Sequence, residues 1–177
     1  AEYPAELFRD VFKKARENGL MITVHAGEAQ GASSIRSAIE HLHADRIGHG
    51  VRIMEDMSLV RLVKERGIYL EMCLTSNVLT NAIPSLESHP IRQLYDMGVK
   101  VTINTDDPIV CGVTLTDEYL HAAQIFAFSL TDIRRMIRNS LEGCFLSETE
   151  KAQIIKERFS AIMNSDDDGR DRSQDDG

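Results

Sequence analysis

The segment VKVTINTDDP, residues 99–108, joins a short apolar run to two adjacent carboxylates. Val99 to Ile103 has the length and composition of a buried strand, and Asp106 and Asp107 follow its end. Because burying an unpaired charge is unfavourable, we expect a cation nearby. Neighbouring strand residues point to opposite faces, so both acids can serve one site only if the chain leaves the strand there; Pro108 fits such an exit. The structural alternative is that one Asp caps a helix and the other lies in a turn.

Three other apolar runs also end in polar residues. They are residues 20–25, which end at His25, residues 46–51, which carry His49 between two glycines, and residues 68–73, which precede the polar segment 75–77. A His followed three residues later by a Glu, as in His25 and Glu28, is a common combination of a metal ligand with an acid. The structural alternative is a turn histidine followed by a glutamate at the start of a helix.

An amphipathic stretch of helical period follows each of these runs. The expected helices are residues 34–43, 56–66 and 89–97 after the first three strands, and 117–126, 131–144 and 148–163 after the fourth, with Thr131 and Ser147 as the N-caps of the last two. Strands that alternate with helices indicate parallel βα units, whose ligand-handling residues lie at the carboxyl ends of the strands. The sequence therefore predicts an α/β fold whose polar clusters meet at one rim.

Four motifs resemble the second half of the adenosine deaminase family. They occur in the order HAGE (25–28), GHG (48–50), CLTSN (73–77) and NTDDP (104–108), and the resemblance runs from about Tyr3 to Phe159. Leu74 stands where many members carry Pro, a form that resembles the bacterial enzymes. The resemblance implies the second half, strands 5–8 with their helices, of a TIM (β/α)8 barrel of the amidohydrolase superfamily. Residues 1–163 would form this half-barrel, and residues 164–177 an acidic disordered tail.

The resemblance also implies a reaction and a role for six residues. The reaction is the zinc-dependent hydrolytic deamination of adenosine and 2'-deoxyadenosine to inosine and ammonia in purine salvage. His25 and Asp106 would be ligands of one Zn²⁺ per complete site, Glu28 would protonate the purine at N1, His49 would orient or deprotonate the attacking water, Asp107 would bind purine N7, and Gly27 would offer its backbone to the base.

One motif of the family is missing. The first barrel strand of the family ends in His-x-His, whereas the only such spacing here, His41-Leu42-His43, closes an expected helix, and we expect both histidines on the surface. A complete barrel needs roughly 250 residues, and this chain has 177. We therefore expect the isolated chain to be inactive and to need an N-terminal half-barrel that carries His-x-His as its partner. A fragment, a cleavage product and a truncated gene product remain open.

The composition argues against several further classes of function. The net charge of −8 argues against nonspecific binding to nucleic acid or to an anionic membrane, and no run has the length of a transmembrane helix. Three cysteines fit reduced thiols in the cytoplasm. Two alternatives to adenosine deamination stay open: an adenine deaminase, whose superfamily members share the His-x-x-Glu and double-Asp features, and a non-catalytic half-barrel that binds a partner.

Overall fold

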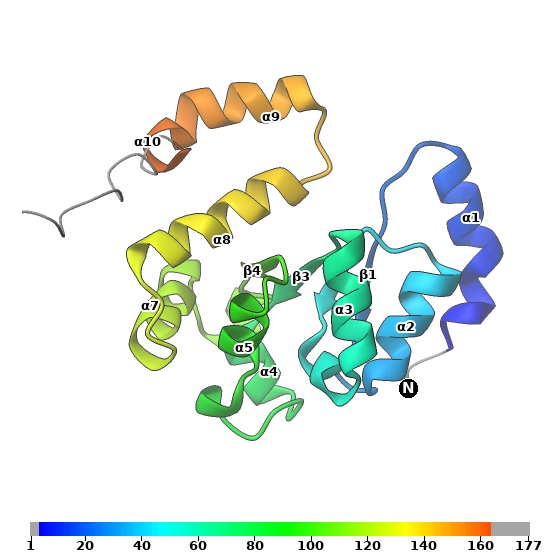
Figure 1. Ribbon diagram of the computed structural model, residues 1–177, viewed down its shortest axis with the longest axis horizontal. Helices are drawn as coiled ribbons and strands as arrows, with labels where there is room; N and C mark the ends of the chain where they lie inside the picture. Colours follow the sequence, from blue (N-terminus) through cyan, green and yellow to red (C-terminus); the bar gives the residue numbers. More distant parts are fainter. Residues whose placement is uncertain (1–3, 164–177) are drawn as a thin grey trace, which may run out of the picture.

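The computed structural model describes residues 4–163 and centres on a parallel sheet (Figure 1). Its four strands, β1 (Thr23–Ala26), β2 (Arg46–His49), β3 (Tyr69–Met72) and β4 (Val101–Ile103), are neighbours in sequence order. The register aligns His25 with Gly48, Gly48 with Glu71, and Glu71 with Thr102. The expected four parallel strands are therefore confirmed. The expected disordered tail, residues 164–177, lies outside the described residues.

Helices follow every strand. The α-helices are α1 (Arg9–Glu17), α2 (Ala32–His41), α3 (Met57–Arg66), α4 (Leu74–Leu79), α5 (Ile91–Asp96), α6 (Pro108–Cys111), α7 (Leu115–Ile125), α8 (Leu130–Gly143), α9 (Glu148–Ile154) and α10 (Ser160–Met163). Short 3-10 segments are η1 (Ala5–Phe8), η2 (Val51–Glu55) and η3 (Leu86–Ser88). Helix α8 contacts β4, and α9 and α10 lie beyond it, away from the sheet (Figure 1).

The expected helices after the fourth strand differ from the structure at two points. Thr131 is not an N-cap, because Ser129 begins α8: its hydroxyl accepts a hydrogen bond from the Asp132 amide, and the Asp132 carboxylate accepts one from the Ser129 amide. The N-cap at Ser147 is confirmed. The single helix expected over 148–163 is interrupted by η4 (Ile155–Phe159), a turn of π-helix.

Helices α1 and α4 were not expected from the sequence. In α4, the Thr-Ser-Asn segment has a composition that favours caps and turns, since short polar side chains compete for the backbone. The structure nevertheless makes it helical, and the amide of Thr75 donates a hydrogen bond to the buried carboxylate of Glu118 on α7, at 3.1 Å. A contact 43 residues away in the sequence thus supports this local structure.

The apolar core lies between one face of the sheet and the helices. The strands contribute Ile47, Leu70, Met72, Val101 and Ile103, and the helices contribute Ile35, Ile39, Leu59, Val63, Leu94 and Met136, all of them buried. Because successive side chains of a strand point to opposite faces of the sheet, the strand residues between these apolar ones face the other side.

The opposite face of the sheet is polar and only partly covered by the described residues. Thr23 donates a hydrogen bond to Glu71 across the sheet at 2.8 Å, and Arg46 Nε lies 3.3 Å from the same carboxylate. All three side chains are exposed or half-buried. Parallel sheets normally have both faces covered, so this face is suited to contact with further structure.

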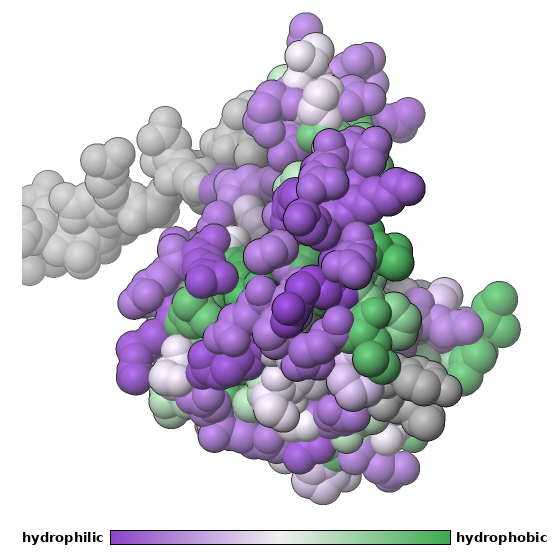
Figure 2. All heavy atoms as spheres, turned by 90° about the vertical axis from the view of Figure 1, so that its right-hand side faces the viewer, coloured by the Kyte–Doolittle hydropathy of each residue, from purple (hydrophilic) through white to green (hydrophobic). Residues whose placement is uncertain are grey.

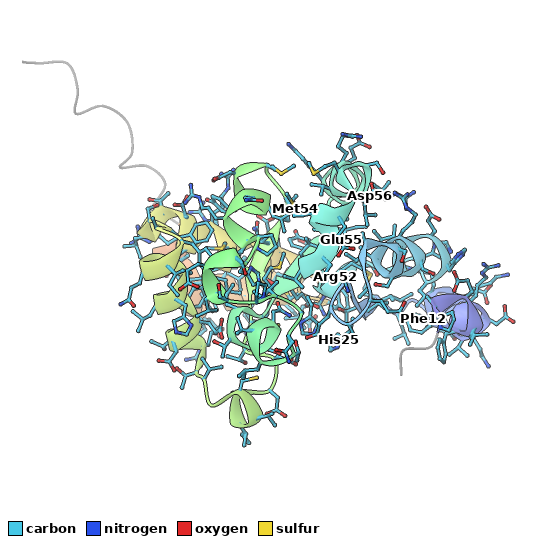
Figure 3. All side chains as sticks on the ribbon, turned by 90° about the horizontal axis from the view of Figure 1, so that it is seen from below. Phe12, His25, Arg52, Met54, Glu55 and Asp56 are labelled. Carbon is cyan, nitrogen blue, oxygen red and sulfur yellow. The ribbon has the colours of Figure 1, made fainter. Side chains whose placement is uncertain are left out.

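A groove of about 670 Å³ runs along β1 between α1 and α2, where Phe12 and His25 both line it (Figure 3). Exposed apolar side chains occur on η1, α1 and the segment before β1: Leu7, Phe8, Val11, Leu20 and Met21. One of them, Phe8, also lines the groove. Figure 2 views this side of the molecule and shows apolar residues among hydrophilic ones. Within residues 4–163, no helix combines the length and apolar character that a membrane crossing requires.

Candidate active site

The carboxyl ends of the strands bring the sequence-predicted residues to one rim. His25 lies in β1, His49 ends β2, and Asp106 follows β4. These three residues line one cavity of about 410 Å³, together with Gly48, Glu71, Cys73, Ile103, Asn104, Thr105 and Leu115. Glu28 lines the neighbouring groove, which it shares with His25. The expected convergence of His25, His49 and Asp106 is therefore confirmed.

Two of these residues have an unusual backbone conformation. His49 has a φ of 65° and Asp106 a φ of 59°, in the left-handed region that non-glycine residues seldom occupy. Such strain gathers at functional sites, where the surrounding structure supports it. Strand β4 ends at Ile103 and α6 begins at Pro108, so the chain leaves the strand at the double Asp, as expected.

The ring of His25 lies directly over the backbone of β2. A Cβ atom added to Gly48 would come within 2.4 Å of His25 Cδ2. The His25 and His49 rings have their centroids 4.9 Å apart and are nearly perpendicular, at 83°. The glycine therefore provides the space in which the two histidines meet.

We expect Gly48→Ala to lower the free energy of unfolding by about 1–3 kcal/mol, the usual cost of overpacking. The added methyl group should also displace the His25 ring, which is its nearest neighbour. Denaturant unfolding measures the first effect, and the His25 ring resonances of histidine-labelled protein report the second.

Gly19→Ala is the control for this substitution. Gly19 has a φ of 77°, and a Cβ added there meets no atom within 4 Å. This variant carries backbone strain but should leave the His25 resonances in place. Unchanged His25 resonances in Gly48→Ala would contradict the expected displacement.

Glu28 faces the ring of His49. Its Oε1 accepts a hydrogen bond from the Thr80 hydroxyl at 2.9 Å and one from Asn77 Nδ2 at 3.4 Å, and its Oε2 lies 3.6 Å from His49 Nε2. The loop after Glu28 is held by Arg52, whose guanidinium donates to the Ala29 carbonyl and to the Glu55 carboxylate; Figure 3 labels this last pair.

His49 is buried, with 2% of its surface exposed. Burial lowers the pKa of His49, the neighbouring Glu28 carboxylate opposes this, and His25 adds to it. The direction is downward, which favours a neutral imidazole around neutral pH.

The two acids after β4 have different surroundings. Asp106 Oδ2 accepts a hydrogen bond from the Ser76 hydroxyl at 2.6 Å. Asp107 Oδ1 accepts from the amides of Ile109 and Val110, so Asp107 is the N-cap of α6, as in the structural alternative. Both acids are exposed among the described residues, and burial alone therefore does not require the cation that we expected.

The backbone of Gly27 is already engaged on both sides. Its amide donates to the Ser34 hydroxyl at 2.8 Å, and its carbonyl accepts from the Arg52 amide at 2.9 Å. Its φ is 69°, and an added Cβ would meet Ile35, so glycine is required here for close contact with α2. Contact of this backbone with a substrate would have to use the second lone pair of the carbonyl or exchange the Ser34 hydrogen bond.

The described residues supply part of a metal site. Within residues 4–163, no group of three or more His, Cys, Asp or Glu side chains is placed to hold a metal ion. His25 and Asp106, which share one cavity, offer the nitrogen and oxygen donors that suit zinc, whereas a catalytic zinc normally has three protein ligands. Burial raises the pKa of the Cys73 thiol, so it stays protonated and is a poor ligand. His41 is not near this cavity and instead pairs with Glu6 at 3.2 Å.

Three residues that position the site were not assigned a role from the sequence. Thr80 contacts Glu28, Glu118 holds the start of α4, and His89 lies behind Asn77. Glu118 and Thr80 carry no sequence signal, because a helix and a turn account for them equally well. His89 lies next to Pro90 at the predicted start of a helix, which gave no hint that it is buried.

Because His89 is buried, its pKa falls from 6.5 to about 3. Below pH 6.5 His89 therefore binds a proton in the unfolded chain but not in the folded chain. The free energy of unfolding falls as pH falls from 6.5 towards about 3. We expect His89 to contribute up to about 1.4 kcal/mol per pH unit to this loss. Urea unfolding of wild type and His89→Gln across this window measures the contribution, since the variant should have the shallower slope. Parallel pH profiles would contradict it.

Solved structures resemble this fold. The adenine deaminase of Arthrobacter aurescens superposes with a TM-score of 0.85 at 32% identity, covering 92% of this chain and 49% of its own. A zinc-bound amidohydrolase from Burkholderia ambifaria gives 0.80 at 27% identity, covering 90% and 46%. The N6-mAMP deaminase of Arabidopsis gives 0.78 at 27%, covering 86% and 45%. The parallel βα sheet with His and Asp at its rim and the likeness to these structures assign the chain to the amidohydrolase superfamily.

Sequence relatives identify the family of this chain within the superfamily. Residues 1–160 match the family profile described as adenosine deaminase. The adenosine deaminase of Clostridium acetobutylicum is 42% identical over 156 residues, 88% of this chain and 47% of its own length, and that of Yersinia pseudotuberculosis is 47% identical over 160 residues, 90% and 48%. The chain belongs to the adenosine deaminase family. It spans about half the length of these curated relatives.

Proposed function

We propose that this chain carries half of the active site of a zinc-dependent adenosine deaminase, which hydrolyses adenosine and 2'-deoxyadenosine and releases ammonia. The observation that carries the proposal is the meeting of His25, His49 and Asp106 at one cavity, with the Glu28 carboxylate 3.6 Å from His49. Family membership and the zinc in one related structure support it.

The four strands would be strands 5–8 of a TIM barrel, and residues 1–163 the second half-barrel. The polar face of the sheet and the groove along β1 favour this arrangement, because both are suited to contact with further strands. The proposed partner is an N-terminal half-barrel that carries His-x-His and so completes the zinc ligands. The whole enzyme's activity is proposed for that assembly.

Each proposed residue has a chemical task. His25 and Asp106 would hold the zinc, which when bound supplies a Lewis acid and lowers the pKa of water. Glu28 would deliver a proton to purine N1, and His49 would orient the attacking water or take its proton. Asp107 would form a hydrogen bond with purine N7, and Gly27 would offer its backbone to the base.

Adenosine is the substrate that the relatives favour, because the curated adenosine deaminases are 42–48% identical, whereas the adenine and N6-mAMP deaminases are 32% and 27% identical. Adenine deamination is the second candidate, since that structure has a TM-score of 0.85. Purine salvage in the cytoplasm is the proposed setting, and the three free cysteines are consistent with it.

The test is a substrate panel for the chain co-expressed with an N-terminal half carrying His-x-His. Adenosine, 2'-deoxyadenosine, adenine and N6-methyl-AMP would be followed by ultraviolet absorbance. The proposal expects the highest kcat/KM for the two nucleosides. Preference for adenine would favour the second candidate, and no turnover in a folded, zinc-loaded assembly would favour a non-catalytic half-barrel.

A further inference from the structure

A line of three buried polar side chains runs behind the candidate active site. His49, Asn77 and His89 are 2%, 0% and 4% exposed, and each contacts the next. His49 belongs to β2, Asn77 to α4, and His89 precedes α5, so three separate elements contribute to the line. Buried polar groups are normally fully hydrogen-bonded, which makes the direction of each hydrogen bond deducible.

The direction is set at the outer end by a backbone amide. The Ile91 N–H donates to His89 Nδ1 at 3.1 Å, and a ring nitrogen that accepts carries no proton. Because burial keeps His89 neutral, its single proton must be on Nε2. His89 Nε2 lies 3.3 Å from Asn77 Oδ1, and therefore donates to it.

The inner end gives the same direction independently. Asn77 Nδ2 lies 3.4 Å from Glu28 Oε1 and 3.1 Å from His49 Nδ1. Glu28 Oε1 already accepts from the Thr80 hydroxyl at 2.9 Å and also accepts from the amide group that faces it, so this group must be the NH₂ group. The same NH₂ group then donates its second proton to His49 Nδ1. Both ends therefore assign the Asn77 amide the same orientation.

We propose that Asn77 and His89 are positioning residues that fix neutral His49 as the tautomer protonated at Nε2. In this form His49 offers an N–H from Nε2 towards Glu28 Oε2 and the site, and has no lone pair there. The consequence for catalysis rests on the proposed function: His49 would orient the attacking water as a hydrogen-bond donor, and would not deprotonate it at Nε2. This chooses between the two roles that remained open for His49.

The tautomer is measured without any reaction. The full chain, labelled with ¹⁵N-histidine, is studied by long-range ¹H–¹⁵N correlation spectroscopy at about pH 8, above the ordinary histidine pKa of about 6.5. His49→Gln assigns the signals by their loss. Wild type should show His49 protonated at Nε2, and a wild-type ring protonated at Nδ1 would overturn the proposal. Because no turnover enters this measurement, its failure and the failure of the deaminase assignment are separate outcomes.

Three variants test the cause. Asn77→Asp replaces the donating NH₂ group with an acceptor and should move the proton of His49 to Nδ1. Thr80→Val is the matched control. Thr80 is the C-cap of the same helix and its hydroxyl contacts Glu28, so this variant should leave the His49 tautomer unchanged. His89→Gln retains a donor towards Asn77 and should keep the Nε2 form. Persistence of the Nε2 form in Asn77→Asp would overturn the proposed control by Asn77.

Discussion

Glu28→Gln should abolish most deamination while leaving the metal in place. In the co-expressed assembly we expect kcat for adenosine to fall by a factor on the order of 10² or more, the usual contribution of general acid–base catalysis. The amide retains the size of the carboxyl group and its acceptor oxygen for Thr80, but it cannot transfer the proton. Steady-state kinetics and zinc analysis of the same preparation measure the two effects.

Thr80→Val is the control for this prediction, because it removes one hydrogen bond to Glu28 and keeps the carboxylate. It should reduce kcat far less than Glu28→Gln. Retained turnover together with lost zinc in Glu28→Gln would show that Glu28 is a ligand and that the roles of acid and ligand have been exchanged.

The chain purified alone should bind zinc weakly and show no measurable deamination, and activity should appear after co-expression with a half-barrel that carries His-x-His. The physical reason is the ligand count: His25 and Asp106 make two, and within residues 4–163 no group of three candidate ligands comes together. Metal analysis and the ultraviolet assay, before and after co-expression, measure the change.

Two outcomes decide this second prediction. His25→Ala in the co-expressed assembly should remove the recovered activity together with the zinc, which shows that the site includes a residue of this chain. Robust turnover by the chain alone would mean that further ligands exist within it. Replacement of His41 and of His43 would then be the next experiments.

The sequence predicted the sheet well because each strand carries its own signal. A short apolar run that ends in His25, His49 or the double Asp identifies both the strand and its carboxyl end. Parallel βα order then places those ends at one rim, and the cavity shared by His25, His49 and Asp106 agrees. The strands and their carboxyl ends were therefore predictable, because a local sequence pattern specifies them.

The surroundings of these side chains were not predictable, because they depend on contacts distant in sequence. Glu28 is contacted by Asn77 and Thr80, 49 and 52 residues away. The start of helix α4 is held by Glu118 from α7, against its local propensity. The role of Asp107 could not be decided from the sequence either. An Asp at this position fits both a helix N-cap and a substrate ligand, and the structure shows the N-cap.

The polar face of the sheet has a consequence for biosynthesis. A barrel made on the ribosome passes through a stage at which one half is formed and the other is unfinished, and partly formed proteins aggregate through exposed apolar surface and unpaired strand edges. Here the polar face of the sheet presents Thr23, Arg46 and Glu71, and the Glu71 carboxylate interacts with both of the other side chains across the strands. In the proposed half-barrel, water would thus be a better partner for that face than a neighbouring chain, and the exposed apolar residues of η1, α1 and the segment before β1 would be the surface more prone to association.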